Sequence, residues 1–210
     1  MNISKRDYFQ NAVTNDRTLW DYQYLLGTFR LKHLENKDLL LVGGGKSRIA
    51  AGLTRAHIKP ASITNIDPFA TPFEQCFGQK LISQKFSDYN MKPNTFDEEW
   101  ALYSLPLYSA NEGEIMNFWA KSIYGLKPNG KLRVYPADEV EEYRGDHAQE
   151  AYAETLPTDS VARECYNRVC RALIQHKGND EHRVIRGWWN QYLRVPEDKT
   201  EINKWAEKFM

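Results

Sequence analysis

The sequence predicts an α/β protein with a doubly wound, mostly parallel sheet that carries helices on both of its faces. Short apolar or β-branched runs alternate with stretches of helical spacing across residues 39–136, and three glycines follow the first run directly. Such alternation is typical of parallel strands joined by right-handed helical crossovers. The 210 residues, of which 41% are hydrophobic and 27% charged, suit one globular domain of this class.

The first strands and helices are predicted from local patterns. A loose apolar stripe predicts a helix within residues 5–28, and the continuous apolar run at 39–42 predicts a strand buried on both faces. Apolar residues at helical spacing predict a helix over 49–56, closed by Pro60. The β-branched segment 62–67 predicts a second strand. A capping box then predicts a short helix within 71–79.

The second half of the sheet follows the same logic. Alternation predicts a third strand over 80–86, and a mainly apolar run predicts a fourth strand over 96–105. Asn111 and Glu114 can cap the next helix, which ends at a glycine. The tight turn KPNG then leads into a fifth strand over 131–136.

The remaining sequence is less regular. Residues 161–173 predict a helix, 183–195 predict either two strands or a broken helix, and 201–210 predict a terminal helix. The chain is therefore expected to form an N-terminal helical cap over residues 1–38. A cofactor-binding domain over 39–210, with an irregular C-terminal part, completes a single domain overall.

The glycine run does not match either phosphate-binding pattern. A Walker loop that ends at residues 45–47 needs its first glycine at position 40, which is Leu40 in the predicted strand. The dinucleotide pattern that begins at Gly43 places Arg48 where a glycine or alanine is required. Lys46 and Ser47 therefore predict the first turn of a helix, where free N–H groups would await a phosphate or a carboxylate.

Two acids follow the next two predicted strands. Asp67 ends the second strand, where a carboxylate commonly accepts both hydroxyls of an adenosine ribose. Asp88 follows the third strand, where a polar side chain can meet an adenine amino group. The alternatives are an ordinary turn aspartate at Asp67-Pro68 and a solvated loop acid at Asp88.

Five stretches, in this order, resemble the class I S-adenosylmethionine-dependent methyltransferases: LLLVGGGKSRIAAGL, ITNIDPF, FSDYN, NTFDEEWALYSLPLY and YGLKPNGKLRVYP. The resemblance covers residues 39–136 and implies a Rossmann-like methyltransferase fold. Leu41 and Ser47 depart from the acid and the third glycine that the family often has, and the GGG variant resembles the aminopropyl-transferring polyamine synthases.

The resemblance also implies a set of site residues. Gly43, Gly44 and Gly45 would lie near the methionine part of S-adenosylmethionine, Asp67 would hold its ribose, Asp88 would lie by its adenine, and Tyr103 and Ser104 would face the methyl group and the substrate. The implied activity is methyl transfer to an unidentified small-molecule or protein acceptor. The alternatives are a non-catalytic binding or interaction module of the same fold, and an enzyme that uses a nicotinamide or nucleotide cofactor.

Other side chains near the predicted site have two interpretations each. Asp138, Glu139 and His147 follow the fifth strand and are candidate general bases, although ordinary surface roles are favoured. Trp20, Tyr22 and Tyr24 could form an aromatic lid, since aromatic rings stack on adenine or face a sulfonium, but plain helix packing is favoured. GWWNQY, at residues 187–192, suits either acceptor specificity or a homodimer surface.

Composition limits the partners. A formal net charge of zero gives no general attraction to nucleic acid, and no run approaches the 18 apolar residues of a membrane span. Cys76, Cys165 and Cys170 lack CxxC spacing, and the five histidines lack metal-ligand spacing, so no metal site is expected. A reducing, cytoplasmic location is the expectation.

Overall fold

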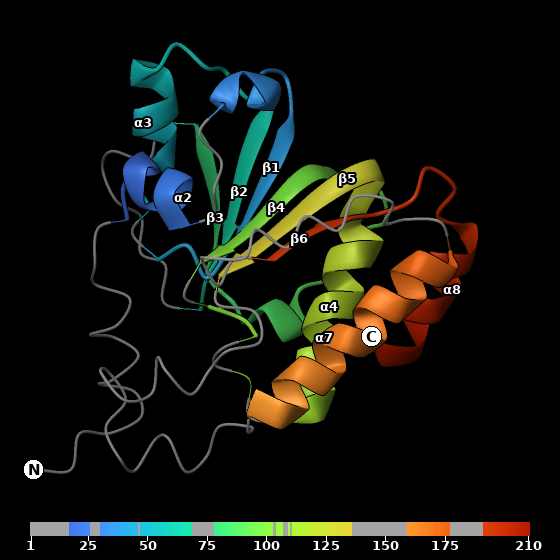
Figure 1. Ribbon diagram of the computed structural model, residues 1–210. Helices are drawn as coiled ribbons and strands as arrows, with labels where there is room; N and C mark the ends of the chain where they lie inside the picture. Colours follow the sequence, from blue (N-terminus) through green and yellow to red (C-terminus); the bar gives the residue numbers. More distant parts are fainter. Residues whose placement is uncertain are drawn as a thin grey trace, which may run out of the picture.

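The computed structural model describes residues 17–25, 30–45, 47–68, 78–102, 104–106, 109, 111–135, 159–176 and 191–210. Within them the chain forms a six-stranded sheet in the order β3-β2-β1-β4-β5-β6 (Figure 1). The strands are β1 (Asp38–Val42), β2 (Ser62–Ile66), β3 (Gln79–Ile82), β4 (Phe96–Leu102), β5 (Leu126–Tyr135) and β6 (Gln191–Arg194). β1 to β5 are parallel, and β6 pairs antiparallel with β5.

Helices cover both faces of this sheet. The α-helices are α2 (Leu19–Leu25), α3 (Ile49–Arg55), α4 (Glu112–Gly125), α7 (Asp159–Gln175) and α8 (Thr200–Ala206); the 3₁₀ helices are η1 (Leu31–Leu34), η2 (Phe86–Asp88) and η3 (Glu207–Phe209). In Figure 1, α2 and α3 lie on one side of the sheet and α4, α7 and α8 on the other. The prediction of a doubly wound, mostly parallel sheet is confirmed.

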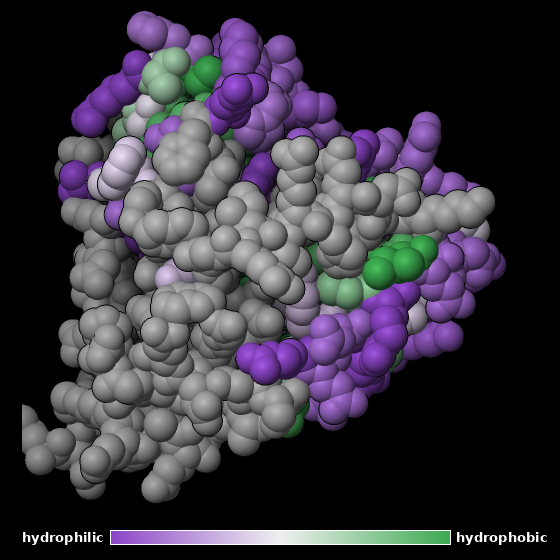
Figure 2. Space-filling view, viewed as in Figure 1, coloured by the Kyte–Doolittle hydropathy of each residue, from purple (hydrophilic) through white to green (hydrophobic). Residues whose placement is uncertain are grey.

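Each face has its own apolar core. Leu39, Leu41 and Trp100 point to the side of α2 and α3, while Leu40 and Leu132 point to the side of α4 and α7. This alternation along β1 is the period-2 pattern of a strand buried on both faces. Hydrophilic side chains cover most of the described surface in the view of Figure 2. No described helix has the length and apolar character needed to cross a lipid bilayer.

Most predicted elements are confirmed, with shifted ends. The side chain of Asn111 accepts the Glu114 N–H at 3.0 Å, so the cap of α4 forms as expected. The predicted third strand is too long, because β3 ends at Ile82 and η2 follows. α3 ends at Arg55, before Pro60, and His57 then adopts a left-handed φ of 55°.

Some predictions changed in kind or lie outside the described residues. KPNG is a bulge inside β5, since the register jumps from Phe96↔Leu126 to Glu98↔Lys131. In the ambiguous segment 183–195, residues 191–194 form β6, which supports the interpretation as strands there. Residues 1–16 and most of the predicted helix at 71–79 lie outside the described residues.

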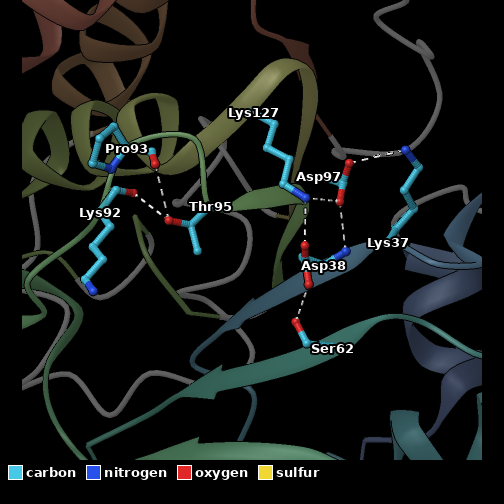
Figure 3. Close-up of polar contacts among 8 residues, drawn as sticks. All are labelled: Lys37, Asp38, Ser62, Lys92, Pro93, Thr95, Asp97 and Lys127. Atoms are coloured by element: carbon cyan, nitrogen blue, oxygen red, sulfur yellow. Dashed lines mark hydrogen bonds and ion pairs between the residues drawn. The ribbon is translucent and has the colours of Figure 1, made fainter.

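An ion-pair network joins the amino ends of four strands, on the edge opposite the glycine turn (Figure 3). The Lys127 Nζ lies 2.7 Å from Asp38 Oδ2 and 2.8 Å from Asp97 Oδ2, and the Lys37 Nζ lies 3.2 Å from Asp97 Oδ1. The Ser62 hydroxyl donates to Asp38 at 2.6 Å. Partial burial opposes ionisation of both acids, but the hydrogen bonds from Lys127 and the other donors, together with the Lys127 charge, outweigh it and hold the pKa of Asp38 and Asp97 below their usual range.

Two adjacent glutamates in β4 are buried on opposite faces of the sheet. Glu98 accepts hydrogen bonds from His33 Nε2 at 2.9 Å, Trp100 Nε1 at 2.7 Å and Arg133 Nε at 2.7 Å. Burial alone would raise its pKa, but these donors and charges lower it to about 2. Glu99 accepts a single described bond, from the Ser122 hydroxyl at 2.5 Å, and burial raises its pKa to about 8.

Glu99→Gln is expected to flatten the pH dependence of stability. The folded protein keeps Glu99 protonated up to about pH 8, whereas the unfolded chain ionises near 4.5. The stabilisation that protonated Glu99 provides is therefore complete below its pKa in the unfolded chain. It is lost as the pH rises through its pKa in the folded protein. The wild type should lose roughly 3–4 kcal/mol of unfolding free energy between pH 5 and 8 that the variant keeps.

Urea unfolding at several pH values measures this difference. Glu197→Gln, at an exposed glutamate, is the control and should follow the wild type. Parallel pH profiles for the wild type and Glu99→Gln would contradict the protonated state of Glu99.

A buried lysine fixes the C-terminal part of the chain to the sheet. The Lys199 Nζ donates to Asn94 Oδ1 at 3.0 Å, to the Tyr124 carbonyl at 3.0 Å and to the Leu126 carbonyl. Burial lowers its pKa to about 7. Since Lys199 directly precedes α8, these hydrogen bonds fix the start of α8 to the junction between α4 and β5.

Candidate functional site

The glycine turn lies at the carboxyl end of β1, where it meets β2 and β4. Gly43 and Gly45 have φ values of +63° and +52°, in the left-handed region that favours glycine. A Cβ atom on Gly43 would lie 2.3 Å from the Ser104 Cβ, and one on Gly44 would lie 2.5 Å from Asn65 Oδ1. The turn therefore needs glycine both for its backbone conformation and for close packing against its neighbours.

The N–H groups of the turn all find acceptors in β2 and the residue that follows it. The Gly43 N–H donates to the Ile66 carbonyl at 2.8 Å, the Gly44 N–H to Asn65 Oδ1 at 3.1 Å and the Gly45 N–H to Asp67 Oδ2 at 2.9 Å. These three N–H groups are therefore occupied, whereas the free N–H groups that the sequence predicts are those of the helix start after them. The Ile66 carbonyl and the Asn65 side chain of β2, together with the Asp67 carboxylate after it, supply the acceptors that a ligand would otherwise provide.

Two N–H groups at the start of α3 also find acceptors within the chain. The Arg48 N–H donates to the Arg17 carbonyl at 2.8 Å, and the Ile49 N–H donates to the Ser47 hydroxyl at 3.3 Å. Ser47 was expected in the first turn of the helix, but α3 begins at Ile49 and Ser47 lies before it. Lys46 lies outside the described residues.

The structure brings three parts of the predicted site together. Val42 pairs with Ile66, so the glycine turn and Asp67 follow neighbouring strand ends, as the sequence predicts. Asp67 is only 3% exposed and is bonded to Gly45, while Ser104, after β4, packs under Gly43. The roles of these residues in ligand binding remain predictions.

Asp88 lies apart from the turn in its described contacts. It is exposed in η2 and accepts a hydrogen bond from the Ser87 hydroxyl at 3.1 Å. The buried Lys121 of α4 donates to the carbonyls of Phe86, Ser87 and Tyr89, with 2.9 Å to Tyr89, and so fixes the segment that carries Asp88. Its predicted contact with adenine remains a prediction.

Of the other residues that the sequence predicts near the site, the structure describes the side chains of Trp20 and Tyr22. Trp20 is 63% exposed on α2, whereas Tyr22 is buried and stacks on Trp100 with ring centroids 5.5 Å apart. Tyr22 therefore has the packing role that was favoured for it. Tyr103, Asp138, Glu139, His147 and the side chain of Tyr24 lie outside the described residues.

Sequence reasoning missed Arg17. Its Nη1 donates to the Gly43 carbonyl at 2.7 Å and to the Leu102 carbonyl, so the guanidinium bridges the carboxyl ends of β1 and β4. The strand order reverses between these two strands, and the crevice at such a switch point is where doubly wound sheets bind ligands. No local pattern marks Arg17, because it makes these contacts with residues far along the chain.

Tyr22 lies in the same electrostatic environment. Burial raises the pKa of its phenol; the nearby Arg17 charge opposes this shift and the Asp67 charge adds to it. The phenol is therefore a neutral hydroxyl at physiological pH. A guanidinium and a buried carboxylate thus bond the glycine turn, and the Tyr22 phenol interacts electrostatically with both. No group of acids, histidines and cysteines suited to a metal ion occurs among the described residues.

Comparisons with known proteins rest on structure alone. No family model matches the sequence, and no curated protein does. A putative S-adenosyl-L-methionine-dependent methyltransferase from Methanococcus maripaludis is similar with a TM-score of 0.54 at 11% identity, covering 94% of this chain and 97% of that one. The complex between the Haloferax volcanii Trm112 methyltransferase activator and the putative methyltransferase gives a TM-score of 0.52 at 13% identity, over 83% and 88%.

A third similar structure is described differently, as a possible exported protein from Bordetella parapertussis. Its TM-score is 0.52 at 14% identity, and the match covers 86% of this chain and 70% of that one. At these identities the likeness shows the fold. The chain has the Rossmann-like fold of the S-adenosylmethionine-dependent methyltransferases.

Proposed function

We propose that the protein binds S-adenosylmethionine at the carboxyl ends of β1 and β2 and transfers its methyl group to a small-molecule or protein acceptor. The observation that carries this proposal is the pairing of the glycine turn with Asp67, held 2.9 Å from the Gly45 N–H in a methyltransferase-like fold. A cytoplasmic location, a homodimer and the division into a cap (1–38) and a domain (39–210) belong to the same proposal.

The geometry favours this cofactor over one that presents a phosphate to the turn. Phosphate-binding turns present free N–H groups, but those of Gly43, Gly44 and Gly45 are bonded to β2 and Asp67. S-adenosylmethionine carries no phosphate, and its methionine carboxylate would need donors other than these three N–H groups. A carboxylate has about four acceptor positions, so Asp67 can accept ribose hydroxyls and keep its bond to Gly45.

The chemistry would depend mainly on position. The bound cofactor supplies a methyl group activated by the sulfonium, and displacement requires the acceptor atom to lie in line with it. Arg17 keeps the ends of β1 and β4 together, and the stacked rings of Tyr22 and Trp100 pack in the apolar core on the α2 and α3 side of the sheet. Ser104 packs beneath Gly43, and we expect the acceptor to approach on its side of the turn.

Titration calorimetry with S-adenosylhomocysteine and, separately, with NAD tests the proposal. We expect micromolar binding of S-adenosylhomocysteine, weakened about 30-fold, or roughly 2 kcal/mol, in Asp67→Asn. Asp198→Asn, before α8, is the matched control and should bind like the wild type. Binding of NAD together with no binding heat from S-adenosylhomocysteine would overturn the proposal. The absence of binding heat with both ligands would favour a non-catalytic interaction module.

A further inference from the structure

Asn65 is an unusual residue for its place in the sheet. It is fully buried in β2, between β1 and β3, and is flanked along the strand by Thr64 and Ile66. A buried primary amide is unfavourable unless its donors and acceptor find partners. An amide side chain that is fully buried in the sheet therefore calls for an explanation in terms of what it bonds.

The Asn65 amide bonds the glycine turn on two sides. Its Oδ1 accepts the Gly44 N–H at 3.1 Å, and its Nδ2 donates to the Gly45 carbonyl at 3.0 Å. The turn needs two residues in the left-handed region, and glycine backbones lose more conformational freedom on ordering than any other. Two bonds from one rigidly held side chain oppose that loss.

The same bonds determine where the next donor points. With Gly44 and the Gly45 carbonyl fixed, the Gly45 N–H is directed at Asp67 Oδ2, 2.9 Å away. Asp67 is only 3% exposed, so this bond holds its carboxylate in one orientation. We propose that Asn65 is a positioning residue that fixes the glycine turn and, through Gly45, the Asp67 carboxylate.

This role rests on the proposed function only where it concerns cofactor affinity. Asn65→Leu removes both bonds at similar volume, and Asn65→Asp keeps an acceptor for Gly44 but sets an oxygen against the Gly45 carbonyl. Gly44→Ala disturbs the same contact from the other side, because its Cβ would lie 2.5 Å from Asn65 Oδ1. Ile63→Val, which loosens the same face of β2 without touching the turn, is the control.

The experiment combines hydrogen exchange of the Gly44 and Gly45 amides, the carboxyl ¹³C chemical shift of Asp67, and S-adenosylhomocysteine affinity. All three Asn65 and Gly44 variants should speed exchange at least about tenfold, move the Asp67 signal, and weaken binding about tenfold or more. Ile63→Val should change none of these beyond a small global shift. The comparison uses variants whose melting curves remain cooperative, and Asn65→Asp serves if Asn65→Leu does not fold.

The outcomes separate this inference from the proposed function. Exchange rates and an Asp67 signal like those of the wild type in a folded Asn65 variant would overturn the positioning role. Faster exchange with unchanged affinity for S-adenosylhomocysteine would also overturn it, since the order of the turn would then have no effect on ligand binding. A wild type that does not bind S-adenosylhomocysteine would overturn the proposed function, and exchange and the Asp67 signal would still decide whether Asn65 fixes the turn.

Discussion

Gly43→Ala is expected to destabilise the protein by about 3 kcal/mol and to abolish binding of S-adenosylhomocysteine. Two costs combine at this position. The φ of +63° is unfavourable for a residue with a Cβ, and that Cβ would lie 2.3 Å from the Ser104 Cβ. The atom it meets lies next to the backbone of the segment after β4, so it cannot swing aside as the end of a flexible side chain could.

Two further variants separate these costs. Gly78→Ala is a matched control, because Gly78 has a φ of +90° and no atom within 4 Å of an added Cβ. It should cost about 1 kcal/mol, the conformational part alone. Ser104→Gly in the Gly43→Ala background should recover the stability that is lost to the steric clash. Urea unfolding of the two single variants and the double variant measures this recovery. Equal losses for Gly43→Ala and Gly78→Ala would show that the close approach to Ser104 is unimportant.

Glu98→Ala should cost about 3–5 kcal/mol, because it removes the buried charge that three donors share, two of them from distant segments. His33, Trp100 and Arg133 would each lose a bond of 2.7–2.9 Å in a buried setting. The pKa of Glu98 is lowered to about 2, so its contribution is complete above the ordinary value of 4.5 and is lost as the pH falls toward 2. The variant should therefore lose part of the acid sensitivity of the wild type.

Chemical unfolding at pH 7 and at pH 3 measures both effects. Glu98→Gln keeps the shape and part of the hydrogen bonding, so it should lie between the wild type and Glu98→Ala at pH 7. Glu99→Gln, one residue along the strand, should show the opposite pH response. A loss below about 1 kcal/mol in Glu98→Ala would mean that water replaces the carboxylate, and that this cluster does not hold η1 and β5 against β4.

The elements predicted best are those whose patterns are local. The apolar run of β1, the β-branched run of β2 and the Asn111 cap of α4 each depend on neighbours within a few residues. The predicted third strand was too long because alternation continues past Ile82, whereas its partner strand β2 ends at Ile66. A strand continues only as far as it has a partner to pair with, and the end of that partner depends on the tertiary structure and not on the local sequence.

The candidate site was predictable only where topology decides it. Carboxyl ends of neighbouring parallel strands share one edge, which is why Asp67 meets the glycine turn. Arg17 and Asn65 were missed because they bond backbone atoms far along the chain, and such bonds leave no spacing pattern. The bond to Asn65 also explains why the Gly44 N–H is occupied. For Glu98 and Glu99, the sequence shows two adjacent acids but does not show which of them receives hydrogen bonds from several donors.

The antiparallel β6 has a consequence for synthesis of the chain on the ribosome. β5 is complete once Tyr135 has been made, but its outer edge gains a partner only when residues 191–194 follow. At roughly 5–20 residues per second, several seconds pass with that edge unpaired. An unpaired strand edge recruits other strands, so this interval is when the nascent chain is most prone to aggregate and when a chaperone would protect it.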